Sequence, residues 1–296
     1  MEQMMRHTTA GAKMNLFLRI GARRADGYHE IDTVLQSLSF GDEVFLRFEL
    51  PHDAEQTVHF TTDFPFGEAE KNLGVIALRA YCRAAGISSY RAFLRIEKKI
   101  PAGAGFGGGS ADAAAVLKLC REQFGALSPQ AMQLLCASIG ADVPFCYAGG
   151  CFRARGIGEK LEALPAAAPC HVLLAIGQES VSTAWAYSLA DRLPPFDQPS
   201  ADQTLSALRE GSLHGLCAAL YNRFEAAVLP HCPQAAALCQ SMLRGGAMGA
   251  MLSGSGAGVF GIFSPQDTAA AEKTSELLRQ SGYWAQLCEA ERNQTR

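Results

Sequence analysis

The sequence predicts an α+β fold made of two domains. Segments with alternating apolar residues and segments with apolar residues three and four apart occur in both halves of the 296-residue chain. The stretch PAAAPC at 165–170 interrupts both patterns with proline and alanine, which marks a boundary. A hydrophobic fraction of 48% supplies ample material for buried cores. We therefore expect one domain at 1–164 and a second at 165–296, with a cleft between them.

Strands and helices alternate in the first half. Gly86 ends one helical pattern, Pro101 stops a strand, and Ser128 is placed to cap a helix that has proline in its first turn. The expected order is strands at 14–21, 42–50 and 57–60, a helix at 72–86, a strand at 90–101, helices at 110–124 and from 129, and a turn with strand-like segments within 140–164.

The second half has the same mixed character. Its apolar patterns change between strand and helix periods several times, and a glycine-rich turn separates two strand-like segments near the end. The expected order is a strand at 171–176, a helix at 183–193, two or three helices between 204 and 244, a strand, turn and strand within 246–263, a helix at 266–281 and a strand at 283–288.

Charge and cysteine usage exclude several classes of protein. The net charge is −3 and no run of five like charges occurs, which argues against nucleic-acid or membrane-surface partners. The N-terminal residues lack an apolar core of signal-peptide length, and HVLLAI at 171–176 is too short to span a bilayer. The ten cysteines form no CxxC pair, and His231, Cys232 and Cys239 lack zinc-site spacing. We expect a cytoplasmic protein with reduced, buried thiols.

One stretch, IPAGAGFGGGSADAAA at 100–115, is a glycine-rich loop followed at once by a helical pattern. The first amides of a helix lack internal partners, and glycines let an anion approach them closely. Gly103, Gly105 and Gly108 satisfy GxGxxG, but Pro101 and the absence of an acidic residue after a next strand disfavour a dinucleotide fold. The chain has no GK dipeptide for a P-loop and neither HRD nor DFG of protein kinases. A purely structural turn remains the alternative.

This loop resembles the phosphate loop of the small-molecule kinases related to galactokinase, homoserine kinase and mevalonate kinase, the GHMP kinases. Further motifs agree with that superfamily in order and place, and they narrow the resemblance to its kinases of 4-diphosphocytidyl-2-C-methyl-D-erythritol. The resemblance extends over nearly the whole chain. The motifs that carry it are AGAKMNLFLRIGARRADGYHEIDTVLQSLSFGDEV at 10–44, GADVPF at 140–145, VSTAWAY at 181–187 and MLSGSGAGVF at 251–260.

The resemblance implies a fold and an activity. The fold is a ribosomal-protein-S5-like N-terminal domain and a ferredoxin-like C-terminal domain, with the active site in the interdomain cleft. The activity is ATP- and Mg²⁺-dependent phosphorylation of the 2-hydroxyl of cytidine-diphosphate methylerythritol in the non-mevalonate isoprenoid pathway, by a monomer or weak homodimer. Two departures are small: family members often have proline at Gly11 and a second serine at Ala111.

The same resemblance assigns catalytic roles to Lys13 and Asp142. A substrate hydroxyl needs a carboxylate to take its proton and a cation to favour its alkoxide form. On sequence alone Asp142 is equally a helix cap or turn former, and Lys13 a solvated strand residue. Asn15 shares the face of Lys13 on a strand, because it follows two residues later, and is expected to bind the methylerythritol hydroxyls.

Residues of the glycine loop and its surroundings are expected to bind ATP. Lys98 matches a family lysine just before the loop, and its alternative is an exposed strand lysine. Ser110 is the only hydroxyl at the junction of loop and helix, so it is the expected magnesium contact. Asn72 resembles the residue on the adenine side. The full ATP set is Asn72, Lys98, Pro101, Gly103, Gly105, Gly107, Gly108, Gly109 and Ser110.

A second set is expected to hold the cytidyl substrate. By resemblance, Tyr28 stacks on cytosine, His29 reads its polar edge, and Tyr187 covers its other face. The second glycine turn is expected beside the substrate diphosphate, and a plain hairpin turn is the alternative. The full substrate set is Asn15, Tyr28, His29, Thr183, Tyr187, Gly254, Ser255 and Gly256.

Two competing functions remain open at this point. A homoserine or mevalonate kinase shares the glycine loop, but the combination of DGYHE and VSTAWAY suits a nucleobase that those substrates lack. A catalytically inactive nucleotide-binding regulator keeps the fold, but Lys13, Asp142 and the glycine loop are intact.

Overall fold

A computed structural model describes residues 4–50, 55–65, 67–193 and 198–292 of the chain. The chain forms two compact units, and each is built from three separate segments. The segments of unit 1 are 1–12, 40–100 and 107–148, and those of unit 2 are 13–39, 101–106 and 149–296.

Unit 1 contains a sheet of long strands. The burial of strand β4 (Tyr90–Glu97) alternates along its length, as expected of a strand with one face on a core. It pairs antiparallel with β2 (His29–Glu49), with Val44 opposite Ile96, and parallel with β3 (Gln56–Thr62). The first residues of β1 (Arg6–Arg23) also belong to this unit.

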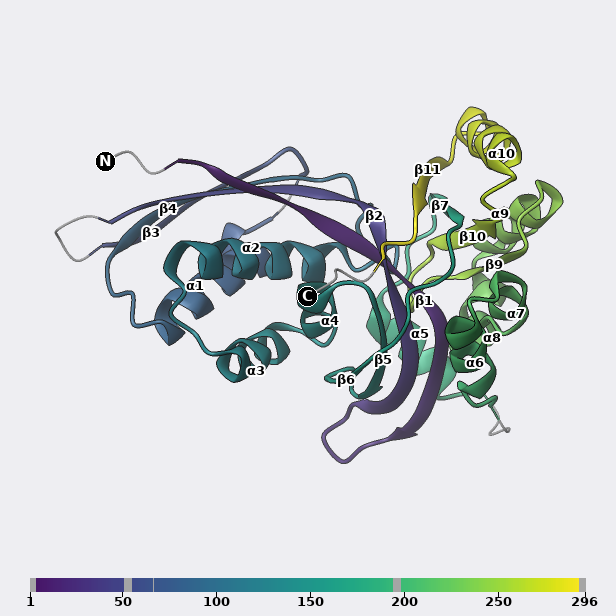
Figure 1. Cartoon of the computed structure of the whole chain (residues 1–296), viewed down its shortest axis with the longest axis horizontal. Helices are drawn as coiled ribbons and strands as arrows, with labels where there is room; N and C mark the ends of the chain where they lie inside the picture. Colours follow the sequence, from purple (N-terminus) through teal and green to yellow (C-terminus); the bar gives the residue numbers. More distant parts are fainter. Residues whose placement is uncertain (1–3, 51–54, 66, 194–197, 293–296) are drawn as a thin grey trace. The chain divides into compact units, whose positions relative to one another are not determined.

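Helices cover one face of that sheet in unit 1, as Figure 1 shows. Helix α1 packs against α2, and apolar side chains of both join those of β2 and β4 in one buried cluster that includes Leu94, Tyr81 and Leu117. These helices are η1 (Ala69–Lys71), α1 (Leu73–Ala84), α2 (Gly108–Phe124), α3 (Pro129–Ile139) and α4 (Val143–Ala148).

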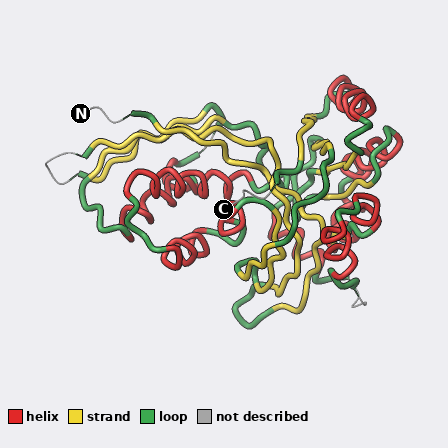
Figure 2. Tube along the Cα trace, in the orientation of Figure 1, coloured by secondary structure: helices red, strands yellow, loops and turns green. Residues whose placement is uncertain are grey.

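Unit 2 contains a four-stranded antiparallel sheet with the order β11-β7-β10-β9. Helix α9 packs on β7, β9 and β10, and α10 packs on β7 and β11, and the tube in Figure 2 shows these helices beside the strands. The chain order β7, α9, β9, β10, α10, β11 is the βαββαβ arrangement of a ferredoxin-like domain, as expected. The bounds are β7 (His171–Ile176), α9 (Pro233–Arg244), β9 (Gly249–Leu252), β10 (Val259–Phe263), α10 (Thr268–Gln280) and β11 (Trp284–Glu289).

The remaining elements of unit 2 extend strands β1 and β2. Strand β5 (Cys151–Gly156) pairs antiparallel with β2 and with β6 (Lys160–Ala163), and β8 (Tyr221–Asn222) pairs parallel with β1. Further helices follow in sequence: α5 (Thr183–Ala190), α6 (Asp202–Glu210), α7 (Leu213–Ala218), α8 (Arg223–Val228) and η2 (Leu229–His231). The α+β prediction is thus confirmed.

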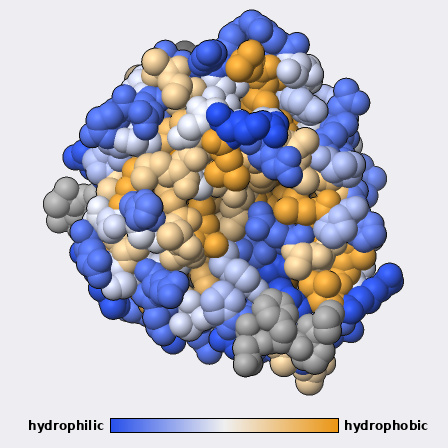
Figure 3. Space-filling model, turned by 90° about the vertical axis from the view of Figure 1, so that its right-hand side faces the viewer, coloured by the Kyte–Doolittle hydropathy of each residue, from blue (hydrophilic) through white to orange (hydrophobic). Residues whose placement is uncertain are grey.

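The surface and the cysteines add little that is specific. The face drawn in Figure 3 carries hydrophilic side chains around its margin and apolar patches toward its middle, and scattered apolar surface residues are ordinary. All ten cysteines are free thiols, and most are buried. Among the helices that the structure describes, none combines the length and hydropathy needed to cross a bilayer.

Candidate active site

The N-terminus of α2 in unit 1 is open to an anion. Its N-cap is Gly107, in the left-handed region at φ 77°, and it provides no side-chain cap. Helix α1, by contrast, is capped by the Asn72 side chain, whose Oδ1 accepts the Gly74 N–H at 2.8 Å. The N-cap residue of α2 thus offers no side-chain acceptor to the first amides of this 17-residue helix, including those of Gly108 and Gly109, which lie at the positive end of its dipole.

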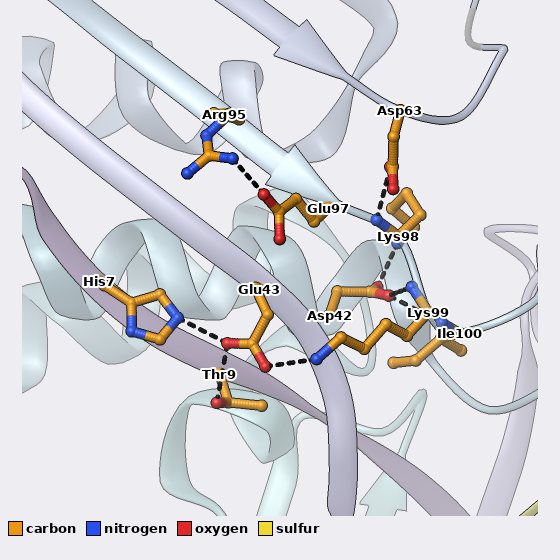
Figure 4. A network of polar contacts seen from close by, with 10 residues as sticks. All are labelled: His7, Thr9, Asp42, Glu43, Asp63, Arg95, Glu97, Lys98, Lys99 and Ile100. Atoms are coloured by element: carbon orange, nitrogen blue, oxygen red, sulfur yellow. Dashed lines mark hydrogen bonds and ion pairs between the residues drawn. The ribbon is translucent and has the colours of Figure 1, made fainter.

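Lys98 lies close to this helix N-terminus, and its side chain is only 17% exposed. Its Nζ contacts the carboxylates of Asp42 and Asp112, the latter at 2.7 Å (Figure 4 shows the Asp42 side). Burial lowers the pKa of the Lys98 ammonium, but the two carboxylates together outweigh burial and raise it. Lys98 is therefore not an exposed strand lysine, and its ammonium stays charged.

Asp142 of unit 1 stands directly before α4. Its backbone carbonyl accepts the N–H of Cys146 at 3.0 Å, which makes it the first acceptor of that helix. Its side chain is partly exposed. Asp142 therefore occupies the helix-start position that the sequence allowed.

Within unit 2 the two glycine turns lie backbone against backbone. The N–H of Gly258 donates to Ala104 O at 3.1 Å, and the Ser253 hydroxyl donates to Gly105 O at 3.1 Å. A Cβ on Gly105, which has φ 81°, would lie 1.9 Å from Ser253 O, so only glycine fits there. The second turn, between β9 and β10, is therefore both a hairpin turn and a support for the first loop.

Lys13 lies at the meeting point of these turns in unit 2. Its N–H donates to Phe106 O at 2.9 Å, and its buried Nζ donates to Asn15 Oδ1 at 2.7 Å. Asn15 Nδ2 in turn donates to the Thr33 hydroxyl at 2.9 Å. A Cβ built on Gly254 would lie 3.2 Å from Lys13 Nζ, which places the second glycine turn beside the lysine. The structure thus places Asn15 beside Lys13, as the strand spacing predicted, and it also brings Gly254 close to the lysine.

Asn222, which the sequence reasoning missed, holds the second glycine turn. Its buried Nδ2 donates to Leu252 O at 2.9 Å and to Gly254 O at 2.8 Å, while its Oδ1 caps α8 by accepting the Phe224 N–H. Glu225 accepts the Leu252 N–H at 3.0 Å, and its burial raises its pKa. The asparagine before a helical pattern was a signal for a cap, but nothing in the sequence placed it at the turn.

A second cluster in unit 2 contains residues predicted to bind the base. The rings of His29 and Tyr187 stack at a centroid distance of 4.8 Å and an interplanar angle of 18°. The Nε2 of His29 lies 2.8 Å from Asp191 Oδ1. Tyr28 is 60% exposed, and the Ser255 hydroxyl donates to Thr183 Oγ1 at 3.1 Å. Asp191 is a further residue that the sequence reasoning missed, because nothing in the pattern joins it to His29.

Comparison with known proteins identifies the family. The model of the GHMP kinases N terminal domain matches residues 72–150, and that of the GHMP kinases C terminal matches residues 204–280. A 4-diphosphocytidyl-2-C-methyl-D-erythritol kinase of Gloeobacter violaceus is 38% identical over 278 residues, which are 91% of this chain and 88% of that protein. The chain belongs to the 4-diphosphocytidyl-2-C-methyl-D-erythritol kinase family of GHMP kinases.

Other members of this kinase family agree. The protein of Desulfitobacterium hafniense with the same name is 36% identical, over 93% of this chain and 92% of its own. A crystal structure of 4-(cytidine 5'-diphospho)-2C-methyl-D-erythritol kinase matches with a TM-score of 0.78 and 32% identity, covering 97% of this chain and all of that one. A mevalonate kinase of L. major matches with a TM-score of 0.76, but at 15% identity it shows a shared fold alone.

Proposed function

We propose that the chain uses ATP to phosphorylate the 2-hydroxyl of 4-(cytidine 5'-diphospho)-2-C-methyl-D-erythritol in the non-mevalonate isoprenoid pathway. The observation that carries this proposal is the cluster of His29, Tyr187 and Asp191 in unit 2. Stacked rings with a fixed hydrogen-bonding nitrogen suit a nucleobase. The substrates of homoserine and mevalonate kinases carry no base, so this cluster favours the cytidyl substrate named for the relatives.

The ATP phosphates are assigned to the N-terminus of α2. The amides after Gly107 fit an anion because the N-cap glycine offers them no side-chain acceptor. Ser110 follows in the same turn and is assigned to phosphate and to magnesium. Asn72, Pro101, Gly103 and the other glycines of the predicted loop set stay assigned to ATP, with Asn72 toward adenine in addition to its role as a cap.

Mg²⁺ is proposed as the metal of the reaction. Among the residues that the structure describes, no group of three or more His, Cys, Asp and Glu side chains is arranged to hold an ion. Few protein ligands are needed for Mg²⁺, because that ion keeps several waters and binds nucleotides mainly through phosphate oxygens. When bound, it neutralises charge that develops on the transferred phosphoryl group.

Lys13 and Asp142 are assigned to the reacting hydroxyl. The Lys13 ammonium is held by Asn15, which is itself held by Thr33, so the cation has a fixed position. We propose that Asp142 accepts the hydroxyl proton while Lys13 stabilises the developing alkoxide. Asn15 is assigned to orienting Lys13 as well as to the methylerythritol hydroxyls.

The base is assigned to Tyr28, His29 and Tyr187. His29 stacks on one face of the Tyr187 ring, so the two residues form one aromatic surface. Tyr28 is exposed and supplies the other stacking surface. The second glycine turn, with Thr183, Ser255 and Gly256, is assigned to the diphosphate, and its contact between Ser255 and Thr183 supports a common site.

The remaining assignments are also proposals. A cytoplasmic location is supported by the ten free cysteines, because reducing compartments keep thiols unpaired. The two family models fall on either side of the predicted domain boundary between 164 and 165, which supports domains at 1–164 and 165–296. The compact units divide the chain differently, because unit 2 also includes 13–39, 101–106 and 149–164. A monomer or weak homodimer stays a prediction.

One assay tests the function. ADP release is measured with ATP and Mg²⁺ in the presence of the cytidyl substrate, homoserine or mevalonate at equal concentrations. We expect turnover with the cytidyl substrate alone, and product analysis should place the new phosphate on the 2-hydroxyl. Faster turnover with homoserine or mevalonate contradicts the proposal. ATP binding without turnover of any substrate favours the alternative of a catalytically inactive nucleotide-binding regulator.

A further inference from the structure

Two buried aspartates and the partly buried Lys98 of unit 1 lie where the glycine loop leaves this unit and where it returns. The chain leaves at Ile100, after strand β4, and returns at Gly107, where α2 begins. Asp42 comes from β2, Lys98 from the outgoing stem and Asp112 from the second turn of α2. None of the catalytic or substrate assignments above uses the two aspartates.

Asp42 fixes the outgoing stem of the loop. It is fully buried, and its Oδ1 accepts the backbone N–H groups of Lys99 at 2.5 Å and Ile100 at 2.7 Å. Figure 4 shows its carboxylate facing this stem. The N–H of Lys98 is also held, because it donates to Asp63 Oδ1 at 2.8 Å. Three successive amides therefore have fixed positions just before the loop.

The Lys98 ammonium joins this stem to α2. It donates to Asp42 Oδ2 and, at 2.7 Å, to Asp112 Oδ2. Asp112 is 1% exposed, and its Oδ1 has no hydrogen-bond partner among the described residues. A Cβ on Gly108, the first residue of α2, would lie 3.4 Å from Lys98 Nζ. The ammonium thus lies next to the first residue of α2, whose N-terminus is assigned to ATP.

These contacts give Lys98 a different role from that of a phosphate ligand. An ammonium shared by two buried carboxylates is already neutralised, and moving it to a phosphate would leave two buried anions together. We propose that Asp42, Lys98 and Asp112 form a clamp that positions the amides of the glycine loop and α2 for ATP, without touching the nucleotide. This inference rests on the proposed ATP-dependent function.

Lys98 as a phosphate ligand and Lys98 as part of the clamp predict opposite changes in ATP affinity for one variant. In Asp112→Asn the lysine remains and the side chain keeps its size. The substitution removes the negative charge that Asp112 carries above its pKa, which burial raises to about 7. If Lys98 bound phosphate directly, the loss of this negative charge would favour an anion at the site and would leave the lysine less tightly held by carboxylates. The clamp predicts the reverse, because α2 loses its charged tie to the stem. We expect the dissociation constant for ATP to rise about tenfold, since small misplacements of binding groups are costly.

Lys99→Met is the matched control. Lys99 is adjacent, carries the same charge and pairs with Glu43 at 2.7 Å, but its side chain is 47% exposed and does not reach α2. ATP binding by Lys99→Met should equal that of the natural chain. Lys98→Met should weaken ATP binding at least as much as Asp112→Asn, and Lys98→Arg should restore part of it.

Isothermal titration of ATP and of the cytidyl substrate, each alone, measures these effects. Loss of the clamp raises the dissociation constant for ATP and leaves that for the cytidyl substrate within about twofold, whereas general loss of structure raises both. Asp42→Asn, with thermal unfolding measured in parallel, provides a second variant if Asp112→Asn folds poorly. Unchanged or tighter ATP binding in Asp112→Asn overturns the clamp. Failure of the cytidyl substrate to turn over contradicts the proposed function but leaves the ATP titration readable.

Discussion

The Nε2 of His29 lies 2.8 Å from the Oδ1 of Asp191. A carboxylate oxygen only accepts, so this contact places the imidazole proton on Nε2 and leaves Nδ1 as an acceptor in the neutral ring. An acceptor suits the 4-amino group of cytosine and opposes the 4-carbonyl oxygen of uracil. Asp191 therefore selects the base through His29, if His29 reads that edge as we propose.

Asp191→Asn should weaken this selection. The amide accepts from Nε2–H or donates to bare Nε2, so both tautomers of His29 become allowed. We expect the ratio of kcat/KM for the cytidyl substrate to that for its uridine analogue to fall about threefold to tenfold, the worth of one hydrogen bond. Glu30→Gln is the control, since Glu30 is an exposed carboxylate next to His29 that pairs with Arg24. An unchanged ratio in Asp191→Asn removes the aspartate from recognition.

Tyr28→Ala should raise KM for the cytidyl substrate. Stacking of a base on an aromatic ring is worth about 1–3 kcal/mol, and each 1.4 kcal/mol is tenfold, so the expected rise is about 5- to 150-fold. KM for ATP should hardly change. His29→Ala should instead reduce discrimination against the uridine analogue, whereas Tyr28→Ala should weaken both bases alike. A rise in KM for ATP alone would mean that the two pockets are assigned the wrong way round.

Local patterns predicted most of the fold. The strand at 171–176 was predicted with the observed bounds, and Ser128 caps α3 as expected. The prediction missed residues 29–41 of β2, whose polar residues and Gly41 obscure the alternation although Gln36 and Ser37 are buried. It also missed α4, because the sequence around Val143 and Pro144 is equally typical of a turn. Both elements form because of their burial in the folded protein and not because of a local sequence pattern.

The candidate site, like the fold, was predictable from the sequence only in part. Short-range signals located the glycine loop, and Asn15 was correctly placed beside Lys13 because strand residues two apart share a face. Contacts between distant segments were not predictable: Asn222 with Gly254, His29 with Asp191, and Lys98 with Asp42 depend on how the strands and turns are packed. Lys98 illustrates the difference, since its sequence environment left an exposed strand lysine open as the alternative to a residue of the ATP site.

Gly105→Ala should destabilise the protein far more than Gly103→Ala. Both glycines have positive φ, at 81° and 71°, so both alanines incur about 1–2 kcal/mol of backbone strain. Only at Gly105 does the new Cβ meet backbone, 1.9 Å from Ser253 O, whereas Gly103 has no atom within 4 Å of that position. The free energies of unfolding of both variants, measured in urea, separate the steric clash at Gly105 from the backbone strain that both variants share. Equal free energies of unfolding would refute the close contact of the two turns.

Stability should fall as the pH rises above about 9. Burial raises the pKa of the Cys82 and Cys151 thiols to about 12, from an ordinary value of 9.0. Between these values the folded chain binds more protons than the unfolded chain, so the free energy of unfolding decreases with pH. Burial also raises the pKa of Tyr81 and Tyr90, with the same sign. Urea unfolding at pH 8, 9 and 10 measures this, and Cys82→Ala should show a shallower fall.

Asp142→Asn should lower kcat by about 10²–10⁴-fold, the usual contribution of a general base. The amide keeps the size of the side chain and most of its hydrogen bonding but cannot take the proton of the substrate hydroxyl. The backbone carbonyl that begins α4 is unaltered, so the helix and the thermal unfolding temperature should be preserved. Dissociation constants for ATP and the cytidyl substrate should change little, because the lost interaction belongs to the transition state. Single-turnover kinetics at saturating concentrations of both substrates isolates the chemical step. A variant that keeps a third of the natural kcat would show that Asp142 is a structural helix-start residue only.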